Sequence, residues 1–192
     1  MEKDRLLAFS DGVLAIIITI MVLELHAPEA ANLEALHGLL PKFLAYVLSF
    51  IYVAIYWVNH HHMLYTAERV SGAVLWANMA LLFFLSLVPF TTAWMGETHG
   101  ALWPTVVYGV SLLAAALSYY VLQTLIIRLH GADHVLKRAV GGDWKGNVSP
   151  VLYVAGIASA FIEPWIGQAF FVVVALLWLV PDPRIERALV KG

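Results

Sequence analysis

The chain has 192 residues, of which 61% are hydrophobic and only 12% are charged. A soluble globular domain carries about 25% charged residues, and a chain of this length cannot hide so much apolar surface in one core. The net charge of −2 gives no basic footprint for nucleic acid, and the absence of cysteine excludes disulfides, iron–sulfur clusters and thiolate zinc sites. The composition therefore predicts an all-α integral protein of the cell membrane, partnered by the lipid bilayer and not by nucleic acid.

Apolar stretches along the chain predict six transmembrane helices in a single domain, residues 1–192. A bilayer core of about 30 Å needs about 20 helical residues. The predicted helices are residues 3–26, 36–64, 72–94, 102–129, 148–162 and 165–180. Pro28 closes the first helix and Pro89 predicts a kink in the third. Because the first helix carries Asp11, Thr19 and Glu24, we expect it to stay in the membrane and not to be a cleaved signal peptide.

The last two predicted helices are short, and only Glu163 and Pro164 separate them. They form a tight hairpin, which is either a pair of tilted spans or a shallow re-entrant hairpin. We favour two spans, because residues 181–184 (Pro-Asp-Pro-Arg) then end the last helix on the charged side. A long hydrophilic segment, residues 130–147, precedes the hairpin.

The basic residues fall almost entirely on one side of this topology. With the N-terminus inside, Lys42 is the only one of the 11 Lys and Arg residues in an outer segment. Cytoplasmic segments carry the excess of Lys and Arg in membrane proteins. The sequence therefore predicts a multi-pass protein with both termini in the cytoplasm.

The first predicted helix carries the densest set of polar residues. At 100° per residue, Ile16, Ile20 and Leu23 form an i, i+4, i+7 stripe with Thr19 beside it. Asp11 lies about 140° from Ile16 and faces another surface. An ionisable group inside a membrane helix must be turned away from hydrocarbon and paired.

Candidate partners for Asp11 lie at the cytoplasmic end of the second predicted helix, where residues 56–62 read Tyr-Trp-Val-Asn-His-His-His. We expect a network of Ser10, Asp11, the histidines and Asn59, which Asn78 of the third helix joins. Consecutive histidines point about 100° apart, so they cannot all ligate one metal ion. Structural hydrogen bonding is favoured for them, with pH sensing and a metal or haem site as alternatives.

The residues Arg5-Leu-Leu-Ala-Phe9-Ser10-Asp11-Gly12 resemble the RxxxFSD signature that opens the first helix of prokaryotic relatives of the lysosomal potassium channel, the transmembrane protein 175 family. Residues 13–24 and 56–61 also look like the first and second helices of that family. The resemblance implies a potassium-selective cation channel, built as a homotetramer of six-helix subunits with the first helix lining a central pore. It implies a pore constriction formed by Ile16, Thr19, Ile20 and Leu23. It also implies a helix-anchoring polar network, formed by Arg5, Phe9, Ser10, Asp11, Asn59, His60, His61 and Asn78.

The chain contains no TVGYG-type carbonyl filter, so potassium selectivity must arise otherwise. Four copies of an Ile/Leu stripe around an axis make a hydrophobic constriction, which gates by dewetting. Potassium holds its water less tightly than sodium and crosses at lower cost, while Thr19 hydroxyls replace part of the lost hydration. Glu24, near the outer end, attracts cations to the pore mouth. We expect a permeant potassium ion, no cofactor, no metal site and no enzymatic activity.

Three other functions stay open at this point. The main alternative is a proton-coupled secondary transporter that uses Asp11 and the histidines of the second helix, although no inverted repeat is evident. A membrane enzyme or haem protein using residues 60–62 is the second. A purely structural membrane subunit is the third.

Overall fold

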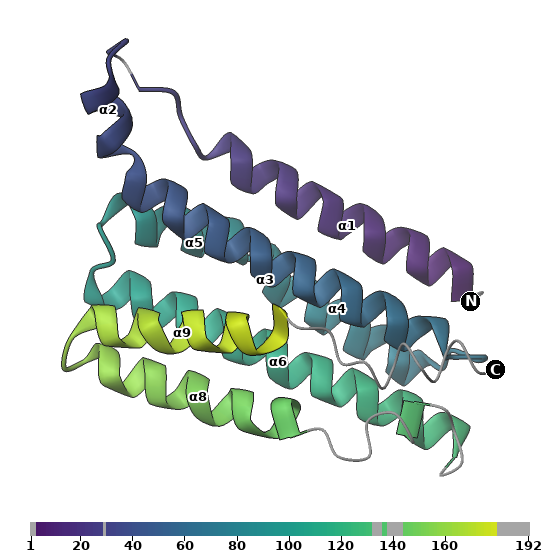
Figure 1. Cartoon of the computed structure of the whole chain (residues 1–192). Helices are drawn as coiled ribbons and strands as arrows, with labels where there is room; N and C mark the ends of the chain where they lie inside the picture. The colour runs from purple at the N-terminus through teal and green to yellow at the C-terminus, as the bar shows by residue number, and fades with distance from the viewer. Residues whose placement is uncertain (1–2, 29, 132–135, 138–143, 180–192) are drawn as a thin grey trace.

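The computed structural model describes residues 3–28, 30–131, 136–137 and 144–179. All regular secondary structure in the elements it assigns is helical, and Figure 1 shows these helices running back and forth along one common direction. In chain order they are α1 (Lys3–Leu23), α2 (Leu33–Gly38), α3 (Leu40–Tyr65), α4 (Gly72–Ser86), α5 (Val88–Glu97), α6 (Leu102–His130), α8 (Trp144–Ala160) and α9 (Pro164–Leu179).

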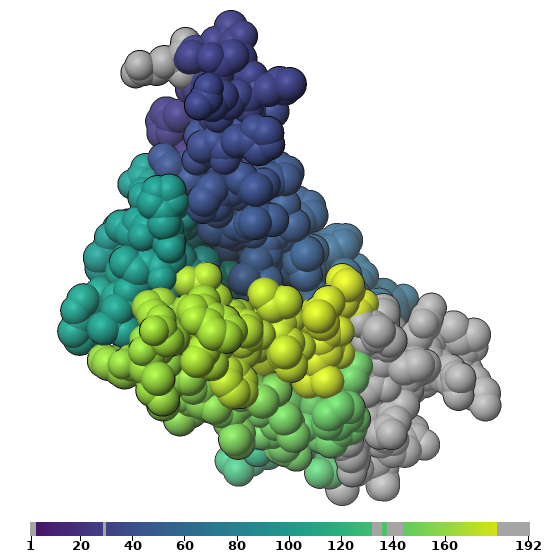
Figure 2. Space-filling model, turned by 60° about the vertical axis from the view of Figure 1, so that its left-hand side comes forward, coloured from purple at the N-terminus to yellow at the C-terminus, as the bar shows by residue number. Residues whose placement is uncertain are grey.

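The predicted second helix is divided in the structure. We predicted one helix over residues 36–64, whereas a separate short helix, α2, precedes α3. The Asn32 side chain caps α2 by accepting a 2.8 Å hydrogen bond from the Ala35 amide, and Pro41 sits in the first turn of α3. Both features start a new helix at their own position, so α2 projects beyond the bundle, as Figure 2 shows.

The predicted third helix is also divided, near the expected kink. Helix α4 ends at Ser86, and α5 begins at Val88 with Pro89 in its first turn. Proline lacks an amide hydrogen, and its ring clashes with the carbonyl four residues earlier, here that of Leu85. The two helices still form one apolar segment, Gly72–Glu97.

Four helical segments in the described part of the chain are long and apolar enough to cross a membrane: Lys3–Leu23, Leu40–Tyr65, Gly72–Glu97 and Leu102–His130. Helices α8 and α9 have 17 and 16 residues, or about 25 Å at 1.5 Å per residue, which is short of a 30 Å bilayer core. The predicted end of the last helix at residue 180, the segment 181–184 and most of the hydrophilic segment 130–147 lie outside the described residues.

Hydrogen bonds tie the helices together at each end of the bundle. At one end, Lys3 Nζ donates to the Tyr65 carbonyl (3.0 Å), and His130 Nε2 accepts from the Glu68 and Arg69 amides. At the other end, Lys42 forms a 3.2 Å ion pair with Glu97. The start of α1, the α3–α4 turn and the end of α6 therefore lie together, opposite the end that holds Lys42 (Figure 1).

Helices α8 and α9 form an antiparallel hairpin that packs on α6 on the side away from α1 (Figure 1). Their close approach depends on two facing glycines. A Cβ on Gly167 would lie 2.7 Å from the Gly156 carbonyl oxygen, and a Cβ on Gly109 of α6 would overlap the Phe171 ring. Small residues allow membrane helices to approach this closely.

Candidate functional site on helix α1

Helix α1 buries only one of its faces. The buried residues recur at steps of three and four, the period of a helix face, and are Leu6, Ser10, Leu14, Ile17 and Met21. This face packs against α3, α4 and α5. The described part of the chain leaves the opposite side of α1 exposed.

The residues predicted to form the constriction lie on this bare side, which we call the open face of α1. Ile16 is 59% exposed and Leu23 is 69% exposed, and Ile20 and Thr19 are exposed as well. The Thr19 hydroxyl donates a 2.9 Å hydrogen bond to the Ala15 carbonyl, so its lone pairs stay available on the open face.

Two of the residues expected to anchor α1 also lie on its open side. Phe9 is half exposed and Arg5 is exposed. They lie on the same side of the helix as Gly12, Phe9 about one turn and Arg5 about two turns closer to the N-terminus. Arg5 is six residues from Asp11, which places the two side chains about 120° apart around the axis. The structure does not bring them together.

Three of the predicted network residues form one hydrogen-bonded chain between α3, α4 and α1. His60 Nε2 lies 2.6 Å from the Asn78 amide oxygen, and Asn78 Nδ2 donates to the Ser10 hydroxyl at 3.0 Å. Ser10 in turn donates to the Leu6 carbonyl at 2.9 Å. All three side chains are buried. Because the Asn78 oxygen accepts, His60 carries its proton on Nε2, which orders the whole chain.

Asp11 is held by a residue that sequence reasoning had not selected. Trp57 Nε1 donates a 2.9 Å hydrogen bond to Asp11 Oδ1, whereas we had expected Asp11 to join a network with Ser10, the histidines and Asn59. The available signal was the place of Trp57 in the same polar stretch as Asn59 and His60, at the depth predicted for Asp11.

The other two predicted members of the network have local partners. Asn59 donates to the Ile55 carbonyl one turn earlier, and its own carbonyl accepts from the Tyr119 hydroxyl of α6. The His61 ring lies against Tyr65, with ring centroids 6.3 Å apart, and its Nδ1 is buried without a hydrogen-bond partner in the described structure. Asn59 therefore fastens α3 to α6, and neither residue reaches α1 through a side-chain hydrogen bond that the structure records.

At the other end of α1, Glu24 lies just past the last helical residue and is exposed. It lines a groove between α1 and α5 together with Ile16, Ile20 and Glu97. Lys42 pairs with Glu97, so the groove ends in two carboxylates and one ammonium group.

Comparison with known proteins places this helix arrangement in a family. The sequence model described as "Endosomal/lysosomal potassium channel TMEM175" matches residues 5–89, from the start of α1 to the first turn of α5. A protein named potassium channel HX13_20290, from a Chryseobacterium strain, is 52% identical over 189 residues, which cover 98% of each chain. The chain belongs to the TMEM175 family. The family resemblance predicted from the first two helices is thereby confirmed.

A solved TMEM175 structure has the same fold. It is the crystal structure of a protein from Chamaesiphon minutus, described as a lysosomal potassium-selective channel TMEM175 homolog. The two structures match with a TM-score of 0.81 at 30% sequence identity, and the match covers 94% of this chain and 98% of the other. A zebrafish relative named endosomal/lysosomal proton channel TMEM175 is 27% identical over 138 residues, only 26% of its own length. The TMEM175 family and its named members are channels and not enzymes, and they do not favour the transporter alternative.

Proposed function

We propose that this TMEM175 protein is a subunit of a potassium-selective cation channel whose pore is lined by α1. The observation that carries the proposal is the open face of α1, where Ile16, Ile20 and Leu23 are exposed along two turns while the opposite face is buried. Membrane-buried polar groups on the packed face hold α1 in one rotation. The apolar stripe is therefore presented in a fixed direction, as a pore lining requires.

One α1 helix cannot enclose a pore, so the open face needs further copies of the chain. We propose a homotetramer with the four α1 helices around a central axis, because closed cyclic symmetry brings identical faces together. The names of the relatives support ion conduction. The names of the Chryseobacterium relative and of the Chamaesiphon minutus protein describe potassium channels, and the name of the zebrafish relative describes a proton channel.

The constriction would select ions by their cost of dehydration. Rings of Ile16, Ile20 and Leu23 exclude water, and an ion that crosses them sheds part of its hydration shell. Potassium loses that water more readily than sodium. Thr19, between two of the rings on the same side of the helix, offers hydroxyl oxygens that replace part of the shell. Glu24 and Glu97 at the outer end raise the local concentration of cations.

We propose six membrane spans, with both termini in the cytoplasm. The end of the bundle that holds Lys3, Arg69 and Arg128 is far richer in basic residues than the end that holds Lys42, which favours a cytoplasmic side for the first. Helices α8 and α9 would be two short spans that pack closely on α6. The bilayer adjusts its thickness to short spans at modest cost.

The test is the reversal potential of the purified chain in a planar bilayer, with potassium on one side and sodium on the other. The expected result is a steady current that reverses toward the potassium equilibrium potential. A second recording with equal potassium and unequal pH distinguishes potassium from proton conduction, because only a proton current then reverses away from zero. Folded protein that carries no current over a range of voltage and pH would overturn the proposal.

A further inference from the structure

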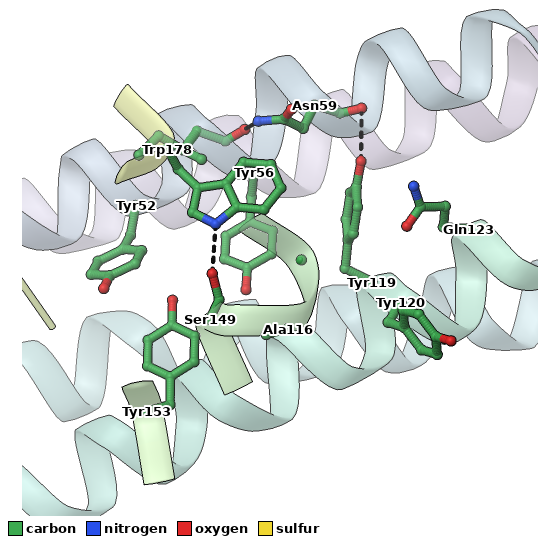
Figure 3. Close-up of a pocket in the computed structure, with 12 residues that line it drawn as sticks. Tyr52, Tyr56, Asn59, Ala116, Tyr119, Tyr120, Gln123, Ser149, Tyr153 and Trp178 are labelled. Atoms are coloured by element: carbon green, nitrogen blue, oxygen red, sulfur yellow. Dashed lines mark hydrogen bonds between the residues drawn. The ribbon is translucent and has the colours of Figure 1, made fainter. Parts of the chain in front are cut away.

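A second hollow lies inside the subunit, away from α1. It is a cavity of about 50 Å³ between α3, α6, α8 and α9 (Figure 3). The aromatic rings of Tyr56, Tyr119, Tyr153 and Trp178 form much of its wall. The channel function proposed above uses none of these residues.

Several polar groups of the wall already have partners. Trp178 Nε1 donates to the Ser149 hydroxyl at 2.8 Å, and the Tyr119 hydroxyl donates to the Asn59 carbonyl at 3.2 Å (Figure 3). These bonds fix the rings in place. They make the cavity a rigid aromatic compartment, not a gap left by loose packing.

Two polar side chains of the cavity wall, Gln123 and Tyr56, have no recorded hydrogen-bond partner. Gln123 is only 6% exposed and Tyr56 only 9%, and within the described part of the chain neither side chain has a hydrogen-bond partner. The fully buried polar atoms without a partner in the described structure are His60 Nδ1 and His61 Nδ1. The polar atoms of Gln123 and Tyr56 therefore keep contact with open space, where water or a guest can bond to them. Both residues line the cavity, and Figure 3 shows the Tyr119 side chain between them, so a guest in the cavity would bond to the hydroxyl on one side of Tyr119 or to the amide on the other.

The chemistry of the wall specifies an uncharged guest. Among the described residues that line the cavity, none is Asp, Glu, Lys or Arg, and an unpaired charge there would be strongly disfavoured. Gln123 and Tyr56 each donate and accept hydrogen bonds. At about 10–15 Å³ for each water-sized guest, the cavity has room for a head group of a few atoms.

The cavity adjoins a surface groove between α3 and α9, which lie side by side in Figure 2. The groove has a volume of about 250 Å³ and shares three lining residues with the cavity, Ile55, Asn59 and Trp178. The rest of its described lining is apolar: Phe50, Ile51, Ala54, Val58 and Leu179. Along α3 the groove runs from Phe50 to Asn59, nine steps or about 13 Å, which suits a medium-length alkyl chain.

We infer that the cavity and groove together bind an uncharged amphiphile from the bilayer, such as a long-chain alcohol or a monoacylglycerol. The hydroxyl head passes between Ile55, Asn59 and Trp178 and bonds to Tyr56 or, beyond Tyr119, to Gln123. The alkyl chain lies in the groove between α3 and α9. This site is separate from the open face of α1, and its occupation does not depend on conduction.

The test uses the full chain in lipid nanodiscs and an eight-carbon alcohol that carries a photoreactive diazirine. We expect saturable labelling, mapped by mass spectrometry to peptides that contain Tyr56, Tyr119 or Tyr153. Excess 1-decanol should reduce the labelling at least several-fold, whereas decane, which lacks a hydroxyl, should not. This competition is measured on the unaltered chain, so it does not depend on any variant folding.

Variants then test the two head-group contacts. Tyr56→Phe and Gln123→Leu keep the volume of the side chain and remove its hydrogen bonding, and each should reduce saturable labelling several-fold. The matched control is Tyr65→Phe, on the same helix but outside the cavity, which should label normally. Filling the cavity with Ala116→Leu should abolish labelling, whereas Ala73→Leu on the exposed side of α4 should not.

Three results would overturn the inference. Equal competition by decane would mean that the groove alone binds hydrocarbon. Equal competition by decanoate would assign the site to anionic amphiphiles. Labelling that does not saturate, or that Tyr56→Phe and Gln123→Leu leave unchanged in protein of normal size-exclusion profile, would mean that the cavity holds only water.

Discussion

Trp57 on α3 donates a hydrogen bond of 2.9 Å to the carboxylate of Asp11 on α1. Asp11 sits at the edge between the buried and the open face of its helix, half-buried. A carboxylate at this depth needs a partner that stays in place. The indole ring supplies one donor on a rigid, apolar body, which fixes the rotation of α1 without adding a second charge.

Replacing that donor should therefore loosen α1. We expect Trp57→Phe to lower the free energy of unfolding by about 1–3 kcal/mol, the cost of leaving a hydrogen-bonding group unpaired. The measurement is the thermal midpoint of the purified protein in detergent. Trp76→Phe is the control, because Trp76 is largely exposed on α4 and donates no hydrogen bond that the structure records. Equal midpoints for the two variants would contradict a structural role for the Trp57 bond.

The His60–Asn78–Ser10 chain should behave as one unit. Asn78→Leu keeps the size of the side chain but leaves His60 without its acceptor, and it should cost about 1–3 kcal/mol. Adding Ser10→Ala to Asn78→Leu should cost little more, because groups in one network are not additive. Denaturant titration of the two single variants and the double variant gives the coupling. Strictly additive losses would show that the hydrogen bonds act separately.

Polar substitution on the open face should change conduction and not folding. Ile16→Asn puts an amide into the proposed constriction, so water enters it more easily. We expect the current to rise several-fold and the preference for potassium over sodium to fall. Val22→Asn is a matched control, since Val22 is comparably exposed on α1 but points about 120° away from Ile16. An effect of Ile16→Asn no larger than that of Val22→Asn would contradict the place of Ile16 in the constriction.

Two glycine-to-alanine substitutions should separate the effect of close helix packing on stability from the effect of helix propensity. Gly167→Ala adds a Cβ only 2.7 Å from the Gly156 carbonyl oxygen, and overpacking of this kind costs about 1–3 kcal/mol. Gly72→Ala, where a Cβ meets nothing within 4 Å, should leave the stability unchanged or slightly raised. Thermal midpoints of the two variants provide the comparison. A stable Gly167→Ala protein would mean that the α8–α9 hairpin can move apart.

Much of the architecture follows from composition alone, because each long apolar stretch has one stable form in lipid. The four longest helices lie within a few residues of their predicted bounds. The separate helix α2 was harder to foresee, since the cap at Asn32 competes with an apolar run that reads continuously into α3. Helices α8 and α9 were expected to be short, at residues 148–162 and 165–180, and are observed at Trp144–Ala160 and Pro164–Leu179. Their close packing on α6 is the part that no local pattern encodes.

The candidate site, like the fold, could be predicted from the sequence only in part. The helical period alone separates the open face of α1 from the buried Ser10, and matched depth alone suggests His60 and Asn78 as its partners. The choice of Trp57 for Asp11 depends on the rotation of α3 about its own axis. That rotation is set by contacts with α6 through Asn59 and Tyr119, which are 60 residues apart in the sequence. Tertiary contacts of this range lie beyond pattern reasoning on a single sequence.

The distance along the chain between the members of the network bears on how the protein is made. Asp11 is separated from Trp57 by 46 positions, and Ser10 from Asn78 by 68. During synthesis α1 leaves the ribosome before α3 and α4 have emerged from it. Its polar groups then depend on water at the membrane surface or on the insertion machinery until α3 and α4 follow. The order of translation thus makes α1 the first helix to be inserted, while its polar groups find their partners only after α3 and α4 have followed.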